Sequence, residues 1–200
     1  MNIFIVYAHP SKDSFTHRAL LGFLEGLDSA GHRHVVSDLY AMDFRTDMTE
    51  EEYRRESHYR LDLPVPCDVL AEQEKINRSD AIVFIYPVFW TEAPAKLVGW
   101  FDRVWTYGFA YGPQRGMKQL EKGLVICIAG RDRGHLDEHG QTDAMKTVML
   151  EDRMHDRVKT RDFVILDSTA KHDLQARQAH WDRHLRTAFM VGANIASTTR

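Results

Sequence analysis

The fold is predicted most clearly by residues 71–104, which read AEQEKINRSDAIVFIYPVFWTEAPAKLVGWFDRV. Residues 81–86 form an unbroken apolar run, as expected for a strand that is buried on both faces of a parallel sheet. Apolar residues then recur with helical spacing, and Pro94 stands where a first helical turn is expected. This helical face consists of Leu97, Val98, Phe101, Val104 and Trp105. The stretch therefore predicts a buried strand, a loop and an amphipathic helix.

Further short apolar or β-branched runs predict the other strands of the sheet. They are residues 3–7, 124–129 and 163–166, with a weaker run at 34–37. Helix-like segments lie between the runs. Because strands and helices alternate, we expect an α/β fold with an open five-stranded parallel sheet and helices on both faces. Residues 1–200 have the size of a single domain.

Three further segments have helical or irregular character. Apolar residues with helical spacing predict a helix that begins near Ser14, and Gly31 supplies its stop. A last helix is expected over 174–193, where it closes the domain. Residues 40–66 contain the run EEEYRRE and only scattered apolar residues, so we expect a polar surface excursion with one short helix.

Composition and charge exclude several classes of function. The chain has 26 Lys and Arg residues against 29 Asp and Glu residues, a formal net charge of −3, so it lacks the positive field that captures nucleic acid. No apolar run is long enough to span a bilayer, and the N-terminus has no leader pattern. Cys67 and Cys127 are sixty positions apart and support neither a disulfide framework nor a zinc site. A cytoplasmic, non-membrane-embedded protein is expected.

Ligands of open α/β sheets bind beyond the carboxyl ends of the strands. Residues 8–20, AHPSKDSFTHRAL, follow the first strand, and a helix start with the hydroxyls of Ser14 and Thr16 suits a phosphate. The glycines of a Walker A or GxGxxG loop are absent. In the alternative interpretation, Ser14 is an ordinary N-cap and His9 is a turn residue.

Aromatic residues follow the strand at 81–86. Residues 86–94, YPVFWTEAP, place flat aromatic surface at the ligand-binding edge, which suits a stacked ring system. The alternative is that Phe89 and Trp90 belong to the core or to a dimer interface. Phe109 and Tyr111 are candidates to extend the same apolar patch. The Gly-punctuated, charged segment 129–140 either covers a cofactor edge or is an ordinary loop.

At this point the sequence resembles a known family, the flavodoxin-like NAD(P)H:quinone oxidoreductases of the DT-diaphorase type. The resemblance covers residues 1–44 and 71–112, about half of the chain. It rests on AHPSKDSFT, SDLYAMDF, the long stretch 71–104 and FAYG. It implies a flavodoxin-like fold, a bound FAD or FMN, NADH or NADPH as donor, and a homodimer with the active site at the subunit interface.

The resemblance also implies roles for individual residues. The loop after the first strand would hold the flavin phosphates through His9, Ser14, Phe15 and Thr16, and the loop Pro87, Val88, Phe89 and Trp90 would contact the isoalloxazine ring. Tyr111 would border the substrate pocket as a catalytic residue. Hydride would pass through flavin N5 to a quinone or a similar aromatic acceptor, whereas azo or nitro compounds are alternative acceptors.

The third loop departs from the family pattern. It reads CIAGRDRGH at residues 127–135, where the family has Thr-Thr-Gly-Gly and then a tyrosine. His135 lies near the place of that tyrosine, and the pair His139 and Gly140 resembles the family's His-Gly pair. His139 is therefore the candidate proton donor or acceptor-binding group, with a surface-loop histidine as the alternative.

Other groups of residues are weaker indications of function. His32 and His34 stand at a turn-to-strand junction, and the helical pair His180 and His184 lacks an HExxH glutamate and any obvious third ligand, so we expect solvated histidines and no metal site. The mixed-charge runs are expected to be exposed. A function of another class, a regulatory or accessory subunit that docks on a membrane transport protein, would use residues 49–60 as its docking surface.

Overall fold

Five parallel strands form the centre of the computed structural model, which describes residues 1–170 and 174–197. They are β1 (Asn2–Tyr7), β2 (Arg33–Asp38), β3 (Ala81–Pro87), β4 (Leu120–Ile128) and β5 (Val158–Leu166). Their order across the sheet is β2-β1-β3-β4-β5, and every neighbouring pair is parallel. All seven residues of β3 are buried. The predicted open five-stranded α/β fold is confirmed.

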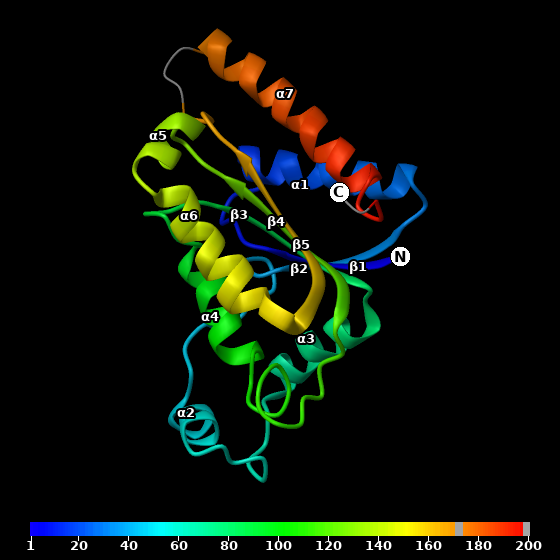
Figure 1. The fold of residues 1–200 in the computed structure, drawn as a ribbon, viewed down its shortest axis with the longest axis vertical. Coiled ribbons are helices and arrows are strands. Elements are labelled where there is room, and N and C mark those ends of the chain that lie inside the picture. Colours follow the sequence, from blue (N-terminus) through cyan, green and yellow to red (C-terminus); the bar gives the residue numbers. More distant parts are fainter. Residues whose placement is uncertain (171–173, 198–200) are drawn as a thin grey trace.

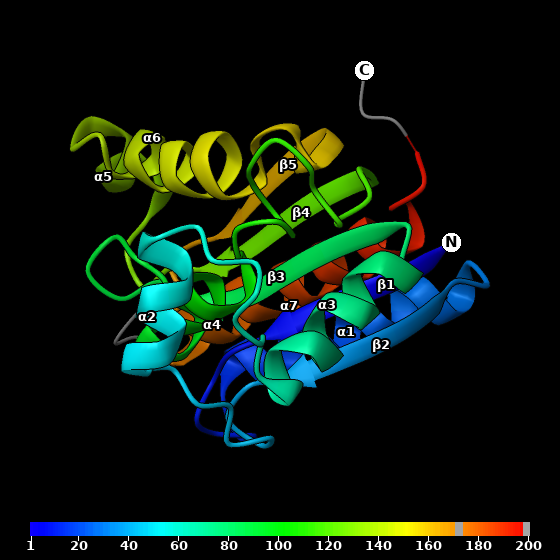
Figure 2. The ribbon, with the colours of Figure 1, turned by 90° about the horizontal axis from the view of Figure 1, so that it is seen from below.

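Helices cover both faces of this sheet (Figures 1 and 2). On one face lie α1 (Phe15–Ser29) and α7 (Leu174–Ala193), and on the other lie α3 (Cys67–Arg78), α4 (Ala95–Val104) and α6 (Gln141–Lys146). The short α5 (Arg133–Glu138) precedes α6, and the π-helix Thr147–Met154 and the 3-10 helix His155–Arg157 lead into β5. Each face has its own apolar core. No helix among the described residues has both the length and the apolar character needed to cross a bilayer.

Two strands are longer than the apolar runs predict. β4 begins at Leu120 rather than residue 124, and β5 begins at Val158 rather than residue 163. The added residues are largely polar, but they are held by the ladder between the two strands, and Lys122 of β4 forms an ion pair of 2.7 Å with Asp162 of β5. Because β5 is an edge strand, its polar half tolerates solvent, so apolar patterning alone misses it.

The excursion at residues 40–66 contains one short helix, as predicted: α2 (Glu50–Ser57). A capping box fixes its start, in which the Thr49 side chain accepts from the Glu52 N–H and the Glu52 carboxylate accepts from the Thr49 N–H. The expectation that its charges are all exposed is wrong. Glu52 and Arg55 are buried, because Glu52 binds Arg103 of α4 and Arg55 donates to the Tyr107 carbonyl.

The pair α1 and α7 is the most extensive helix contact outside the sheet. Ser14 caps α1, and Gly31, with a φ of +71°, follows its end as predicted. His184 of α7 is only 6% exposed and its Nε2 donates to the Asp167 carbonyl at 2.8 Å. The expectation of a solvated histidine is therefore wrong at this position, since a backbone acceptor replaces water. Among the described residues, no three His, Cys, Asp or Glu side chains gather in a way suited to a metal ion.

Candidate active site

A pocket of about 730 Å³ opens at the carboxyl ends of β3, β4 and β5. Three loops line it, one after each strand, and α6 closes it with Gln141. The loop residues are Val88, Trp90 and Thr91 after β3, Ala129–Asp132, His135 and Leu136 after β4, and Ser168 and Ala170 after β5. This is the edge at which parallel sheets bind ligands, and apolar atoms dominate the wall.

The loop after β3 folds into a two-residue hairpin that presents Trp90 to solvent. Phe89 and Glu92 exchange both backbone hydrogen bonds, at 2.9 and 3.0 Å, so Trp90 and Thr91 occupy the turn. Both turn residues have positive φ, +54° and +67°, a conformation that costs about 1–3 kcal/mol at each non-glycine residue. Trp90 is 99% exposed and Phe89 is 49% exposed, so neither is a core residue.

Gln141 ties this hairpin to α6 and offers an unused acceptor. Its side-chain N–H donates to the Thr91 hydroxyl at 2.8 Å, whereas its Oε1 is buried and has no hydrogen-bond partner. Gly140, with a φ of +67°, starts α6 in front of it. A buried amide oxygen without a partner costs free energy, so a ligand with an N–H group in this pocket would gain from it. Gln141 could not be found from the sequence, because a single polar residue at the start of a short helix forms no pattern.

In the loop after β1, the structure is compatible with a phosphate site at the start of α1 and also with the alternative of an N-cap and a turn residue. The Ser11 N–H donates to His9 Nδ1 at 3.0 Å, so His9 is a turn residue, and burial lowers the pKa of His9. Ser14 accepts from the His17 N–H at 3.1 Å and is therefore the N-cap. Thr16 is buried in the first turn of α1. None of these residues lines the 730 Å³ pocket, so their role with phosphate stays a prediction.

Two buried polar atoms beside this helix start lack ordinary hydrogen bonds. They are the hydroxyl of Tyr7 and Nδ1 of His17, whose rings lie 5.9 Å apart. Burial raises the pKa of Tyr7 to about 12, so the hydroxyl keeps its proton and can donate it. Phe15 instead stacks on Trp181 of α7, with ring centroids 4.9 Å apart. An anion at the N-terminus of α1 would meet free backbone N–H groups and an unused hydroxyl.

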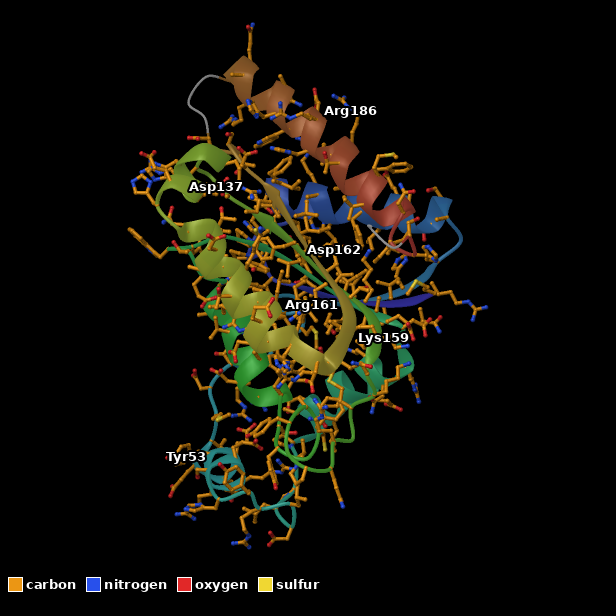
Figure 3. The ribbon with its side chains drawn as sticks, in the orientation of Figure 1. Tyr53, Asp137, Lys159, Arg161, Asp162 and Arg186 are labelled. Atoms are coloured by element: carbon orange, nitrogen blue, oxygen red, sulfur yellow. The ribbon has the colours of Figure 1, made fainter. Side chains whose placement is uncertain are left out.

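Tyr111 lies away from the pocket, next to α2. Its hydroxyl donates to Glu56 at 2.9 Å, and the same carboxylate accepts from the Tyr107 N–H at 2.7 Å. Burial, and then the Glu56 carboxylate, raise the pKa of Tyr111. In Figure 3, Tyr53 of α2 lies at one end of the molecule and Asp137 of α5 lies toward the other. Phe109 is buried in the core and adds nothing to the pocket surface.

His139 is exposed at the C-terminus of α5 and is absent from the pocket wall. The histidine that lines the pocket is His135, one turn earlier. Of the predicted site residues, the structure therefore places Val88 and Trp90 in the pocket, and Pro87 at the end of β3 beside them. Ser168, which lines the wall with a φ of +56°, was missed because a single serine after a strand resembles any loop residue.

Comparisons with known proteins agree with this fold. The model of a family described by its flavodoxin-like fold matches residues 1–185. A solved NAD(P)H:quinone oxidoreductase from Methanothermobacter marburgensis is 41% identical, covers 100% of this chain and 99% of its own, and superposes with a TM-score of 0.93.

Curated relatives match over shorter stretches. NAD(P)H dehydrogenase (quinone) 1 of Rattus norvegicus is 39% identical over 144 residues, which are 63% of this chain and 52% of the relative. A ribosyldihydronicotinamide dehydrogenase-like protein of Penicillium crustosum is 36% identical over 124 residues, 56% of this chain and 46% of its own. The chain thus spans about half the length of these two relatives.

Proposed function

This chain belongs to the family with the flavodoxin-like fold, and from that premise we propose that it is a flavin-dependent NAD(P)H oxidoreductase that reduces quinones. The observation that carries the proposal is the apolar pocket at the carboxyl edge of the sheet, in a chain that is 41% identical to a quinone oxidoreductase over its whole length. The activity of the shorter-matching curated relatives, whose names denote quinone dehydrogenases, is of the same class.

The residues present fit a flavin. Val88, Trp90 and Leu136 supply apolar wall for a flat ring system, and the Oε1 of Gln141 supplies an acceptor for a ring N–H. The N-terminus of α1, with Ser14 and Thr16, suits the phosphate. A bound flavin would accept hydride from a reduced nicotinamide and deliver it to an electron-poor ring, which is chemistry that no side chain provides.

The protein side chains then bind, orient and exclude water. The exposed Trp90 indole, presented by its strained hairpin at the pocket rim, offers a surface on which a flat ligand stacks, and Gln141 orients a ligand while holding Thr91. The hydrogen of the Tyr111 hydroxyl is already donated to Glu56, so this group presents only its lone pairs. A quinone has only carbonyl oxygens and cannot donate to those lone pairs, so we assign Tyr111 to contact with the flat acceptor through its ring, rather than to proton donation.

We also propose that the protein is a homodimer. The side chains of Phe89, Trp90, Tyr53 and Tyr59 are about half exposed or more, which is unusual for so many large aromatic groups. Tyr111 lies beside α2, far from the pocket of its own chain. Association of two copies through these aromatic side chains would cover them and would bring Tyr111 of one copy toward the pocket of the other.

The alternative of a docking subunit finds less support in the geometry. Its proposed surface, residues 49–60, directs Glu52 and Arg55 inward, where they bind groups of the same chain. The charges of this segment therefore fasten it to α4 and to the Tyr107 carbonyl instead of facing a partner.

Reconstitution tests the function directly. Protein incubated with FMN or FAD and then desalted is expected to retain flavin, and the mass of the released cofactor distinguishes FMN from FAD. Oxidation of NADH and NADPH is then followed with a quinone, an azo dye and a nitroaromatic compound, and the quinone is expected to give the fastest turnover. Protein that retains no flavin, or that retains flavin without oxidising either nucleotide, would contradict the proposal.

The phosphate site gives a specific prediction. The double substitution Ser14→Ala and Thr16→Ala is expected to lower the melting temperature of the apoprotein modestly, because loss of an N-cap costs about 0.5–2 kcal/mol. If the two hydroxyls hold the flavin phosphate, the rise in melting temperature produced by added flavin also shrinks, since ligand stabilisation depends on the dissociation constant.

Thr49→Ala is the matched control, because it removes the N-cap of α2, away from the pocket. It is expected to lower the melting temperature of the apoprotein but to leave the flavin-induced rise intact. An equal flavin-induced rise in the Ser14 and Thr16 double variant and the wild type would reduce both residues to structural roles.

A further inference from the structure

Two histidines on α5 lie against each other at the rim of the pocket. His135 and His139 are four residues apart, and their rings stack with centroids 4.1 Å apart and an interplanar angle of 28°. His135 is half-buried and lines the pocket, whereas His139 is exposed. Figure 3 shows α5, with Asp137 labelled, at an edge of the molecule, where solvent reaches it. Histidines at this helical spacing are the pair that H-E-x-x-H helices use to bind zinc.

The hydrogen bond of His139 leaves one ring nitrogen free to bind a metal. Its Nδ1 lies 2.9 Å from the His135 carbonyl oxygen. A carbonyl only accepts, so Nδ1 carries the hydrogen, and the neutral ring has its lone pair on Nε2. Metal-binding histidines characteristically donate their second ring N–H to a carbonyl or carboxylate in this way. The bond thus fixes both the tautomer and the orientation of a ligand.

The other histidine pair at the same spacing is engaged differently. In α7, Nε2 of His184 donates to the Asp167 carbonyl, and Nδ1 of His180 lies 2.6 Å from an Arg183 guanidinium nitrogen, from which it accepts. His184 is also buried. The spacing of four residues is therefore common to both pairs, but only the pair on α5 combines a free lone pair with access to solvent.

We propose that His135 and His139 form a two-histidine chelate for a divalent transition-metal ion such as Zn²⁺. Imidazole nitrogen is a preferred ligand of this class of ion. No third His, Cys, Asp or Glu side chain of the described chain completes the group, so water fills the remaining positions and the ion exchanges readily. The site is one of reversible binding, in contrast to a permanent structural metal.

Because His135 also lines the pocket, a bound ion would affect the reductase activity, and this expectation rests on the proposed function. Because His135 is part of the pocket wall, an ion held there with its waters narrows the entrance and adds positive charge to it. Zn²⁺ is therefore expected to inhibit the reductase by competing with the acceptor, while the flavin stays bound.

Calorimetric titration of the flavin-reconstituted, untagged protein with Zn²⁺ tests the chelate without any turnover. The wild type is expected to show a saturable site of one ion per chain. His135→Gln and His139→Gln are each expected to lose that site. His180→Gln is the matched control from the other pair and is expected to keep it. Circular dichroism establishes that each variant is folded.

Two results would overturn the proposal. One is the absence of a saturable site in the folded wild type, and the other is Zn²⁺ binding that His139→Gln leaves unchanged. In a parallel kinetic assay, Zn²⁺ should raise the apparent KM for the acceptor in the wild type and not in His139→Gln. Zn²⁺ binding by a protein without turnover would contradict the proposed function alone, and turnover without Zn²⁺ binding would contradict this inference alone.

Discussion

Gly26→Ala is expected to destabilise the fold by about 3 kcal/mol or more, because it forces apart the two helices on one face of the sheet. A Cβ atom at this position would lie 2.1 Å from the Phe189 carbonyl oxygen and 2.9 Å from the Ala193 nitrogen. Both are backbone atoms of α7, so no side-chain rotation relieves the clash. On the facing helix, a Cβ at Gly192 would lie 2.3 Å from the Phe23 carbonyl oxygen. The two glycines thus mark the closest approach of α1 and α7.

Gly22→Ala is the control, one turn earlier on the same helix. Its Cβ would meet the Leu185 carbonyl oxygen at 3.4 Å, an ordinary contact. Because alanine is the better helix former by about 1 kcal/mol, this variant is expected to be as stable as the wild type or more so. Equilibrium unfolding of the apoproteins in urea measures both changes. Equal unfolding free energies for the two variants would show that α7 can move off α1 at little cost.

The pattern of apolar residues along the chain predicted the helices and strands whose side chains are either clearly buried or clearly exposed. The run at 81–86 is apolar because β3 is buried on both faces, and its strand was found almost to the residue. The helix expected from Ser14 begins where a hydroxyl side chain caps it, and that cap is visible in the sequence as a residue type. The last helix was predicted over 174–193, the bounds of α7.

Polar residues were harder to place, because their environment depends on distant partners. Glu52 and Arg55 belong to the charged run EEEYRRE, which has the same composition whether it faces water or buried counter-charges. In the pocket, Trp90 was predicted from its residue type and position after a strand. Gln141 and Ser168 were not predicted, since each becomes a site residue only when the loops after β3, β4 and β5 come together in the folded chain.

Arg103→Met is expected to destabilise the protein by about 3 kcal/mol, since it removes one partner of a buried ionic cluster. The side chain of Arg103 is fully buried, and its Nε donates to Glu52 at 2.8 Å. Its two terminal nitrogens donate to Asp68 at 2.6 and 3.0 Å, and one of them also donates to the Arg45 carbonyl. Methionine preserves most of the volume, so the loss measures the hydrogen bonds and charge that Glu52 and Asp68 lose rather than a cavity.

Arg115→Met is the matched control, because Arg115 pairs with Asp156 at 2.7 Å on the surface. Exposed pairs contribute about 0–1 kcal/mol, so this variant should unfold at nearly the wild-type urea concentration. Arg103→Lys keeps the charge but lacks the planar fork that binds Asp68 through two nitrogens, and its stability should fall between those of Arg103→Met and the wild type. A wild-type unfolding free energy for Arg103→Met would show that Glu52 and Asp68 find water or other partners without loss.

The dependence on pH distinguishes charge from packing in the effect of Arg103. The guanidinium of Arg103 is the main cause that holds the pKa of Asp68 below its ordinary value, which is about 3.9 in unfolded chains. A carboxyl group with a lowered pKa stabilises the folded state above that pH, and the stabilisation is lost as the pH falls through the folded-state pKa. The difference in unfolding free energy between wild type and Arg103→Met should therefore be largest near neutral pH and should shrink below about pH 4. A difference that stays constant down to pH 3 would assign the effect to packing against Phe44, whose ring lies 5.1 Å from the guanidinium carbon.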